Sequence, residues 1–333
     1  MEDAALIEKA HLVQTTFERL MAELKKVIVG QEDLLRHLFT CLLCGGHGLI
    51  EGVPGLGKTL VVRSLGQVLH LKYSRIQFTP DLMPADILGT NIVNQDDEGR
   101  RFFQFFPGPI FGQIILADEI NRATPKTQSA LLEAMQEEKV TVFGKEYPLE
   151  PPFIVLATQN PLEMEGTYPL PEAQVDRFFF KLKITYPNAE EMGEILDKTT
   201  EEAAPELHPV VSADTILEMK RLVRQVPVAE HVKSYAIRLV LASHPDDPLA
   251  VARAKQYVRI GASPRGVQSL ILGAKVAALF DGRFNASLED VQAVALPALR
   301  HRLLLNLRGE AEGVDTDAVV SDLVRGVPTR TRA

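Results

Sequence analysis

Hydrophobic and polar residues follow one pattern in the first part of the chain and another in the second. Up to about residue 188, short apolar runs of strand length alternate with amphipathic helical segments, two of which span residues 6–26 and 126–138. Strands that alternate with helices form parallel sheets, so we expect a five-stranded parallel sheet. The predicted strands span residues 47–51, 73–78, 114–117, 153–157 and 178–184.

After residue 188 the pattern indicates helices separated by Pro, Gly and Asp, with no predicted strand. We therefore divide the chain into an α/β domain, residues 1–188, and an α-helical domain, residues 189–333. Two segments interrupt the α/β domain, 89–109 and 139–152. Each has glycine between residues of β character, so each is predicted to be a β-hairpin.

The strongest chemical signal is the loop between the first predicted strand and the helix after it. It reads Gly52, Val53, Pro54, Gly55, Leu56, Gly57, Lys58, Thr59, which matches G-x-x-x-x-G-K-[ST] at every fixed position. Leu60, the next residue, is also predicted to contact the nucleotide. In such a loop the backbone N–H groups and the start of the helix face phosphate oxygens. Lys58 is predicted to reach the β- and γ-phosphates and Thr59 to coordinate Mg²⁺. The loop therefore predicts binding of ATP and Mg²⁺.

Two further predicted strands end in polar residues. Asp118 and Glu119 follow the strand at 114–117, and Asn160 follows the strand at 153–157. The carboxyl ends of parallel strands are where an open α/β sheet binds its ligand. Asp118 is predicted to hold the metal, Glu119 to deprotonate the attacking water, and Asn160 to hydrogen-bond a phosphate oxygen or that water. Taken alone, Asn before Pro would indicate only a turn.

Composition narrows the choice of partners. The chain is 46% hydrophobic and carries a formal charge of −8, which disfavours a nucleic-acid-binding surface. No apolar run approaches the roughly 20 residues that cross a bilayer, and the amino terminus lacks a signal-peptide pattern, so we expect a cytoplasmic protein without membrane insertion. Cys41 and Cys44 form a C-x-x-C pair that would suit redox or zinc chemistry, but their apolar surroundings favour a buried helix end.

Five motifs in order resemble the AAA+ superfamily and, within it, the MoxR family of ATPases: GVPGLGKT, ILADEINRA, LATQNP, YPLPEAQVDRFFFKL and GASPRGVQSL. The resemblance implies an AAA+ P-loop core, two hairpin inserts and a carboxy-terminal helical lid, with the nucleotide at the junction of core and lid. It also implies that Asn160 is the sensor 1 residue and that Arg265, on the lid, is the sensor 2 residue.

The same resemblance implies a ring, expected to be a hexamer, with ATP hydrolysed between neighbouring copies. Arg177 is then the arginine finger, and Arg122 a further arginine acting across the interface. Val29, Gly30 and Gln31 are implied to line the adenine pocket. Without the resemblance, Arg122 and Arg265 would be interpreted as surface ion pairs, since the chain holds 36 Lys and Arg residues.

MoxR-like proteins are regarded as chaperone-like remodellers of partner proteins, often with a partner that has a von Willebrand factor A domain. In the first hairpin, residues 100–106 include four phenylalanines that would suit gripping a polypeptide. We favour the alternative that these rings pack against their own domain, because large aromatic side chains are more often buried.

Three functions fit these residues: an ATPase that remodels a protein, a nucleotide-gated binding module with little turnover, and a nucleic-acid translocase or loader. Glu119 favours turnover over the second function. The acidic balance and the absence of a recognisable nucleic-acid-binding segment disfavour the third. We therefore expect a Mg²⁺-dependent ATPase that remodels a protein partner.

Overall fold

Five parallel strands form the central sheet, in the order β2-β5-β8-β1-β9. The structure, a computed structural model, describes residues 2–161, 166–200 and 205–329. The strands are β1 (Gly48–Glu51), β2 (Tyr73–Gln77), β5 (Ile114–Asp118), β8 (Ile154–Gln159) and β9 (Phe180–Lys183). The predicted parallel sheet and all five of its strands are therefore confirmed.

Both faces of the sheet are covered, because successive side chains of each strand point to opposite sides. The helices of this domain are α1 (Glu2–Leu24), α2 (Glu32–Cys44), α3 (Lys58–Val68), α4 (Pro84–Leu88), α5 (Pro125–Glu137) and α6 (Glu172–Val175), with 3-10 turns η1 (Pro109–Phe111) and η2 (Ile120–Arg122). Ile114 and Leu116 pack with α1–α3, whereas Ile115 and Ala117 pack with α5.

The two cysteines lie on α2 inside this core. Cys41 and Cys44 are buried free thiols, and burial raises the pKa of both well above the ordinary value. A thiol whose pKa is raised is a poor nucleophile and a poor metal ligand. The interpretation of this pair as part of a buried helix is confirmed.

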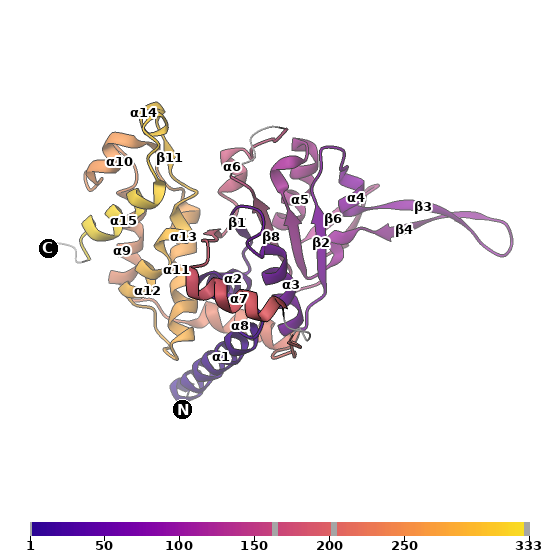
Figure 1. Cartoon of the computed structure of the whole chain (residues 1–333), viewed down its shortest axis with the longest axis horizontal. Helices are drawn as coiled ribbons and strands as arrows, with labels where there is room; N and C mark the ends of the chain where they lie inside the picture. Colours follow the sequence, from indigo (N-terminus) through magenta and orange to yellow (C-terminus); the bar gives the residue numbers. More distant parts are fainter. Residues whose placement is uncertain (1, 162–165, 201–204, 330–333) are drawn as a thin grey trace.

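Both predicted hairpins are present. The first consists of β3 (Gly89–Gln95) and β4 (Arg101–Pro107), and Figure 1 shows it as a long arm projecting from the body. The second consists of β6 (Lys139–Val142) and β7 (Lys145–Pro148). The expectation that the phenylalanines of the first hairpin pack on their own domain is wrong for three of the four.

Phe102, Phe103 and Phe106 are exposed to 46%, 76% and 64%. Only Phe105 packs inward, with its ring centroid 4.0 Å from that of Tyr147. The arm extends beyond the body of the domain, so only its base has a surface to pack against.

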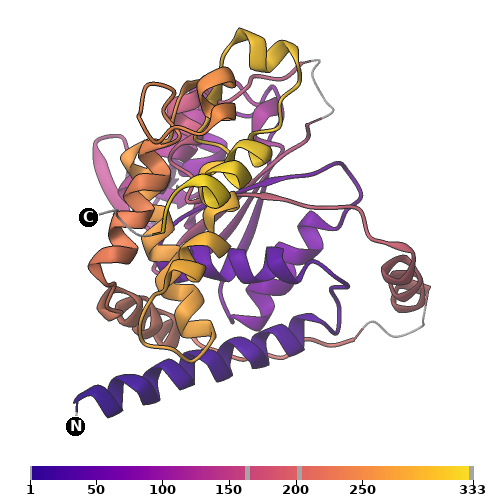
Figure 2. The same ribbon diagram turned by 90° about the vertical axis from the view of Figure 1, so that its left-hand side faces the viewer.

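The second region is helical, and α1 and α2 of the core pack against its longest helix, α11. The helices are α7 (Ala189–Thr200), α8 (Ala213–Gln225), α9 (Glu230–Leu241), α10 (Ala252–Tyr257), α11 (Pro264–Phe280), α12 (Leu288–Ala293), α13 (Ala295–Leu299), α14 (Leu307–Ala311) and α15 (Thr316–Gly326). Figure 2 shows α7 at the side of the molecule, away from the other helices of this region.

The expectation of no strand after residue 188 is wrong. β10 (Val258–Ile260) and β11 (Leu304–Leu305) form a small antiparallel pair. Strands of two or three residues are too short for an alternating pattern to show in sequence. The domain boundary after residue 188 stays a prediction. Among the described residues no helix is long and apolar enough to span a membrane, and the cytoplasmic location stays a prediction.

Candidate nucleotide site

The loop between β1 and α3 forms an open cradle. Gly55 and Gly57 have φ of +86° and +75°, a conformation that strains any residue with a Cβ, and no atom lies within 4 Å of where a Cβ would stand. The Lys58 ammonium curls into this loop, where it donates to the carbonyl oxygens of Gly52 (2.5 Å) and Val53 (2.9 Å). An open glycine cradle with a lysine inside it and a helix starting at Lys58 fits a polyphosphate.

The predicted acidic and amide residues lie at the same edge of the sheet as this loop. Asp118 ends β5, Asn160 directly follows β8, and both are more than nine-tenths buried. Thr158 joins the two strands: its hydroxyl donates to Asp118 Oδ1 (2.7 Å) and accepts from the backbone N–H of Glu119 (2.8 Å). Glu119 itself has φ of +58°, which turns the chain sharply at the strand end.

Strand β2 contributes two residues that sequence reasoning missed. Arg75 donates two hydrogen bonds to Asp118 Oδ2, and Gln77 donates to Glu119 Oε2 (2.9 Å). Arg122 also donates to Glu119 Oε2, at 3.1 Å. The available signal was spacing, since Arg75 and Gln77 are two residues apart on a strand that ends at this edge, and alternate residues share a face.

Arg122 therefore contacts the Glu119 carboxylate of its own chain. Its role across an interface stays a prediction.

The donors at this edge suit Mg²⁺ that arrives with a nucleotide. Mg²⁺ is usually bound through one or two protein oxygens plus phosphate oxygens and waters. Thr59 offers a hydroxyl at the second residue of α3, and Asp118 offers a carboxylate. The described residues contain no group of three His, Cys, Asp or Glu side chains that would make a separate metal cage.

An apolar cavity of about 270 Å³ opens beside the loop, between Gly55–Gly57 and α7. Its lining includes Val29, Gln31 and Leu60, which were expected to contact the nucleotide. At the neighbouring Gly30, φ is +64°, a conformation that favours glycine, and a Cβ there would meet the Glu191 carboxylate. This apolar space next to the phosphate cradle suits a purine base.

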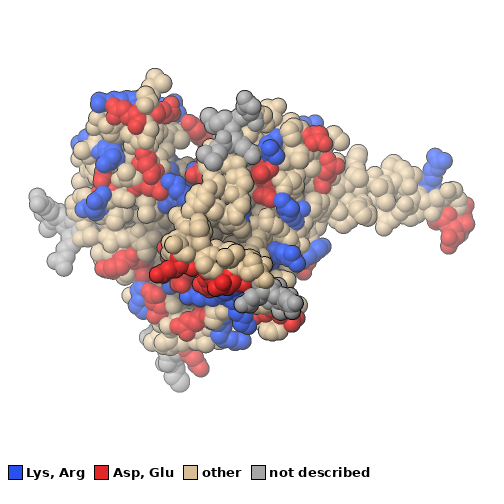
Figure 3. Space-filling model, in the orientation of Figure 1, with Lys and Arg blue, Asp and Glu red and all other residues tan. Residues whose placement is uncertain are grey.

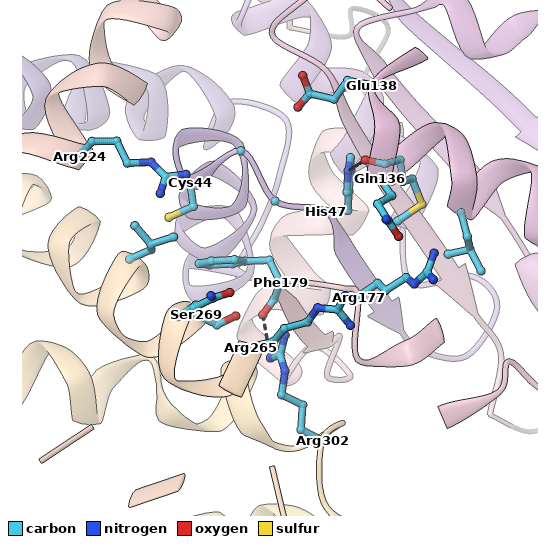
Figure 4. A pocket seen from close by; sticks show the side chains of 16 residues that line it. Cys44, His47, Gln136, Glu138, Arg177, Phe179, Arg224, Arg265, Ser269 and Arg302 are labelled. Atoms are coloured by element: carbon cyan, nitrogen blue, oxygen red, sulfur yellow. Dashed lines mark hydrogen bonds between the residues drawn. The ribbon is translucent and has the colours of Figure 1, made fainter. Parts of the chain in front are cut away.

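The remaining two predicted residues, Arg177 and Arg265, lie away from the nucleotide loop. Arg177 precedes β9, whose first residue Phe180 is level with Gly48, the first residue of β1. Arg177 is therefore at the amino edge of the sheet, whereas the nucleotide loop is at the carboxyl edge. Arg177 and Arg265 line one cavity of about 300 Å³ together with Arg224 and Arg302 (Figure 4).

Asp176 ties the lid to the core beside Arg177. Its carboxylate accepts hydrogen bonds from Arg265 (3.2 Å), Arg302 (3.0 Å) and Ser263 (2.8 Å), all from the lid. The Arg302 side chain is 2% exposed, and burial lowers its pKa to about 10, with Asp176 opposing that shift. Arg265, expected on the lid beside the nucleotide, is thus held next to Arg177.

In this structure one copy holds the nucleotide loop at one edge of the sheet and Arg177 with Arg265 at the other. β1 spans four residues, which at about 3.3 Å per residue separates the two edges by about 10 Å before the flanking loops are added. Within one copy, the lid borders the nucleotide cavity through residues of α7, not through Arg265.

Family models match two parts of the chain. Residues 47–180 match "ATPase family associated with various cellular activities (AAA)", and residues 250–323 match "AAA lid domain". The first covers the nucleotide loop through the start of β9. The second covers the lid helices from α10 to α15.

The similarity to other proteins extends over nearly the whole chain. "Chaperone MoxR1" of Mycobacterium tuberculosis is 42% identical over 94% of this chain and 82% of its own length. "Protein MoxR" of Paracoccus denitrificans is 31% identical over 87% of this chain and 89% of its own length. A crystal structure assigned as an ATPase, from Cytophaga hutchinsonii, superposes with a TM-score of 0.91 at 41% identity, covering 98% of this chain and 99% of that one.

Proposed function

Because this chain belongs to the MoxR family of AAA+ ATPases, we propose that it hydrolyses ATP at the contacts between copies in a ring and so remodels a protein partner. The observation that carries this proposal is the separation of the site into two parts. Lys58, Asp118 and Glu119 lie at one edge of the sheet, and Arg177 and Arg265 lie at the other. A second copy is the simplest source of the missing arginines.

The residues of one copy have distinct roles in this reaction. Lys58 and Thr59 hold the phosphates and the metal, with Asp118 as the second protein ligand. Glu119 accepts the proton of the attacking water, and Asn160 orients that water or a phosphate oxygen. When bound, ATP and Mg²⁺ supply the phosphoryl group and neutralise part of its charge. Val29, Gly30 and Gln31 border the base.

Arg177 and Arg265 of the neighbouring copy complete the site. A guanidinium offers a fork of donors to oxygens that gain negative charge in the transition state, so two of them at the γ-phosphate would accelerate hydrolysis. Asp176 holds Arg265 in place through its hydrogen bond, and Arg302 holds Asp176. This arrangement makes the lid of one copy part of the next copy's active site. It replaces the expectation that Arg265 serves the nucleotide of its own chain.

The projecting hairpin supports a protein as the partner. Phe102, Phe103 and Phe106 together display apolar surface on an arm that has no core of its own. Exposed aromatic groups of this kind mark contact sites for other proteins. The partner class that the family resemblance points to is a protein with a von Willebrand factor A domain, and the ring that it points to is a hexamer.

The test is to mix two inactive variants. Lys58→Ala lacks nucleotide binding but keeps its arginines, whereas Arg177→Ala keeps the nucleotide loop but lacks the arginine. Each alone should lose most ATPase activity, and an equimolar mixture should regain part of it, because some interfaces then pair an intact loop with an intact Arg177. Arg308→Ala, on the exposed side of α14, is the matched control and should behave as wild type.

Two results would contradict the proposal. Full activity of Arg177→Ala would leave a self-contained ATPase. A specific rate of the wild type that does not rise with protein concentration, together with no recovery in the mixture, would exclude a site shared between copies.

A further inference from the structure

The outward face of α7 carries a row of carboxylates. Glu190, Glu194 and Asp197 are spaced by four and three residues, so they share one face of the helix, and all three are exposed. Asp and Glu side chains gather over α7 in Figure 3. Among the described residues, only Glu194 of the three forms a salt bridge, with Lys198 at 2.8 Å.

α7 is free to contact a partner on this face. None of its side chains is buried, and it stands at the side of the molecule in Figure 2. It begins with reciprocal hydrogen bonds between Asn188 and Glu191, which fix its first turn. Its opposite side, through Ile195 and Thr199, walls the nucleotide cavity. α7 therefore separates the nucleotide cavity on one side from the carboxylate face on the other.

Three cations gather on the lid at the other edge of the sheet. Lys220 and Arg224 are one turn apart on α8, and Lys275 of α11 donates to the Arg224 carbonyl oxygen (3.2 Å). None of the three forms a salt bridge with a described residue. Burial lowers the pKa of Lys220 and of Lys275, and the Arg224 charge lowers both further, while Glu138 acts against this at Lys220.

This cationic cluster adjoins the arginine cavity. Lys220 Nζ lies 3.3 Å from where a Cβ on Gly45 would stand, in the turn that precedes β1. Arg224 lines the same cavity as Arg177 and Arg265 (Figure 4). Repulsion within the cluster would be relieved by carboxylates from outside the chain.

We infer that in the assembled ring the carboxylate face of α7 docks on the Lys220, Arg224 and Lys275 cluster of the neighbouring copy. The inference rests on the proposed function, in which Arg177 of one copy reaches the nucleotide loop of the next. Bringing those two parts together also brings together the elements beside them, α7 on one side and the cluster on the other. A ring contact joins two different faces of the chain, and here the faces have opposite charge.

The contact would link assembly to the nucleotide. α7 borders the nucleotide cavity on one side and meets the neighbour on the other, so a shift of α7 when the cavity fills changes how its carboxylates present themselves. We therefore expect the docked state to be favoured by bound nucleotide and weakened by salt, which screens charges at a partly exposed contact.

The experiment uses charge reversal on a background that retains nucleotide, Glu119→Gln, with ATP, Mg²⁺ and sedimentation velocity. Reversing α7 (Glu190→Lys with Asp197→Lys) or the cluster (Arg224→Glu with Lys275→Glu) should raise the protein concentration needed for assembly by about ten-fold, equivalent to about 1.4 kcal/mol. If the paired change in the cluster impairs folding, the single change Arg224→Glu, at an exposed position, replaces it in the experiment. Asp97→Lys, at the hairpin tip, is the control and should assemble as wild type.

The decisive arm mixes the two reversed variants. In an alternating ring every contact again joins opposite charges, so the mixture should assemble at a lower concentration than either variant alone. Assembly of each variant at the wild-type concentration would overturn the α7 contact and leave the shared ATPase site untouched. No assembly of the Glu119→Gln background at any concentration would overturn both the ring and the contact.

Discussion

Arg75 is bonded to Asp118 through two of its nitrogens, with Nε at 3.1 Å and Nη2 at 2.7 Å from the same carboxylate oxygen. Asp118 is the carboxylate expected to hold the metal, and its side chain is 9% exposed. A guanidinium and Mg²⁺ are both cations and compete for one oxygen. A metal bound through Asp118 would therefore compete with a residue of the chain itself.

Replacing Arg75 with Ala should lower the Mg²⁺ concentration that gives half-maximal ATPase activity. The competing ion pair is partly exposed on the arginine side, so we expect a modest change of about three-fold. The measurement is ATPase rate against Mg²⁺ at saturating ATP, with Arg63→Ala as control. A higher Mg²⁺ requirement would mean that Arg75 positions Asp118 for the metal.

Glu119→Gln should retain nucleotide binding while steady-state hydrolysis falls by about 100-fold or more, because an amide cannot accept the proton of water. Gln keeps an oxygen that can accept from Gln77 and Arg122, so the local structure should persist. Binding of a fluorescent ATP analogue and phosphate release measure the two effects separately. Glu133→Gln on α5 is the control. Undiminished hydrolysis would remove Glu119 from the role of base.

Substitutions of two hairpin phenylalanines should affect stability and partner binding separately. Phe105→Ser removes a ring stacked on Tyr147 and should lower the free energy of unfolding by about 2 kcal/mol. Phe103→Ser, at a position 76% exposed, should change it by less than about 0.5 kcal/mol.

Chemical denaturation measures both stabilities. Capture of an unfolded model polypeptide should weaken with Phe103→Ser. Capture equal to wild type would mean that this ring is not a contact for substrate.

Stability should fall as pH decreases from about 6.5 towards 4. Burial lowers the pKa of His37 and His47 to about 4 and that of His301 well below 6.5. Each has a folded-state pKa below its unfolded value, so the unfolded chain binds protons that the folded chain cannot, and acid favours unfolding. Each histidine contributes a slope of up to about 1.4 kcal/mol per pH unit in this window.

His47 shows the cause at atomic level. Nδ1 accepts from the Val155 N–H (3.0 Å) and Nε2 donates to the Met135 carbonyl (2.9 Å), so a proton on Nδ1 would break the first bond. Urea denaturation at pH 7, 6 and 5 is the measurement. His47→Gln, which can donate and accept in the same positions, should flatten part of the slope. An unchanged unfolding midpoint across the window would contradict these burial effects.

Local patterns in the sequence predict the nucleotide half of the site. The glycines at 55 and 57 need positive φ for the loop, and a buried strand ending in Asp118 and Glu119 places both at the sheet edge, so each inference follows from neighbouring residues. The parallel sheet follows for the same reason.

The arginine half of the proposed site, Arg177 and Arg265, depends on long-range contacts that no local sequence pattern encodes. Arg265 is 89 residues from Asp176, and Arg302 is 126 residues away. Which lid face meets the core is decided by packing of α11 on α1 and α2, so the position of Arg265 beside Arg177 was out of reach. The same holds for the exposed phenylalanines, since their burial depends on how far the arm extends.

The short strands β1 and β9 hold the nucleotide loop at one end and Arg177 at the other. In the proposed ring, copies joined through these ends would all point the same way, so the closed assembly would have a handed order. Each copy would give its arginines to one neighbour and receive them from the other. A conformational change that begins at one nucleotide would then pass from copy to copy in one rotational sense, although every subunit is identical.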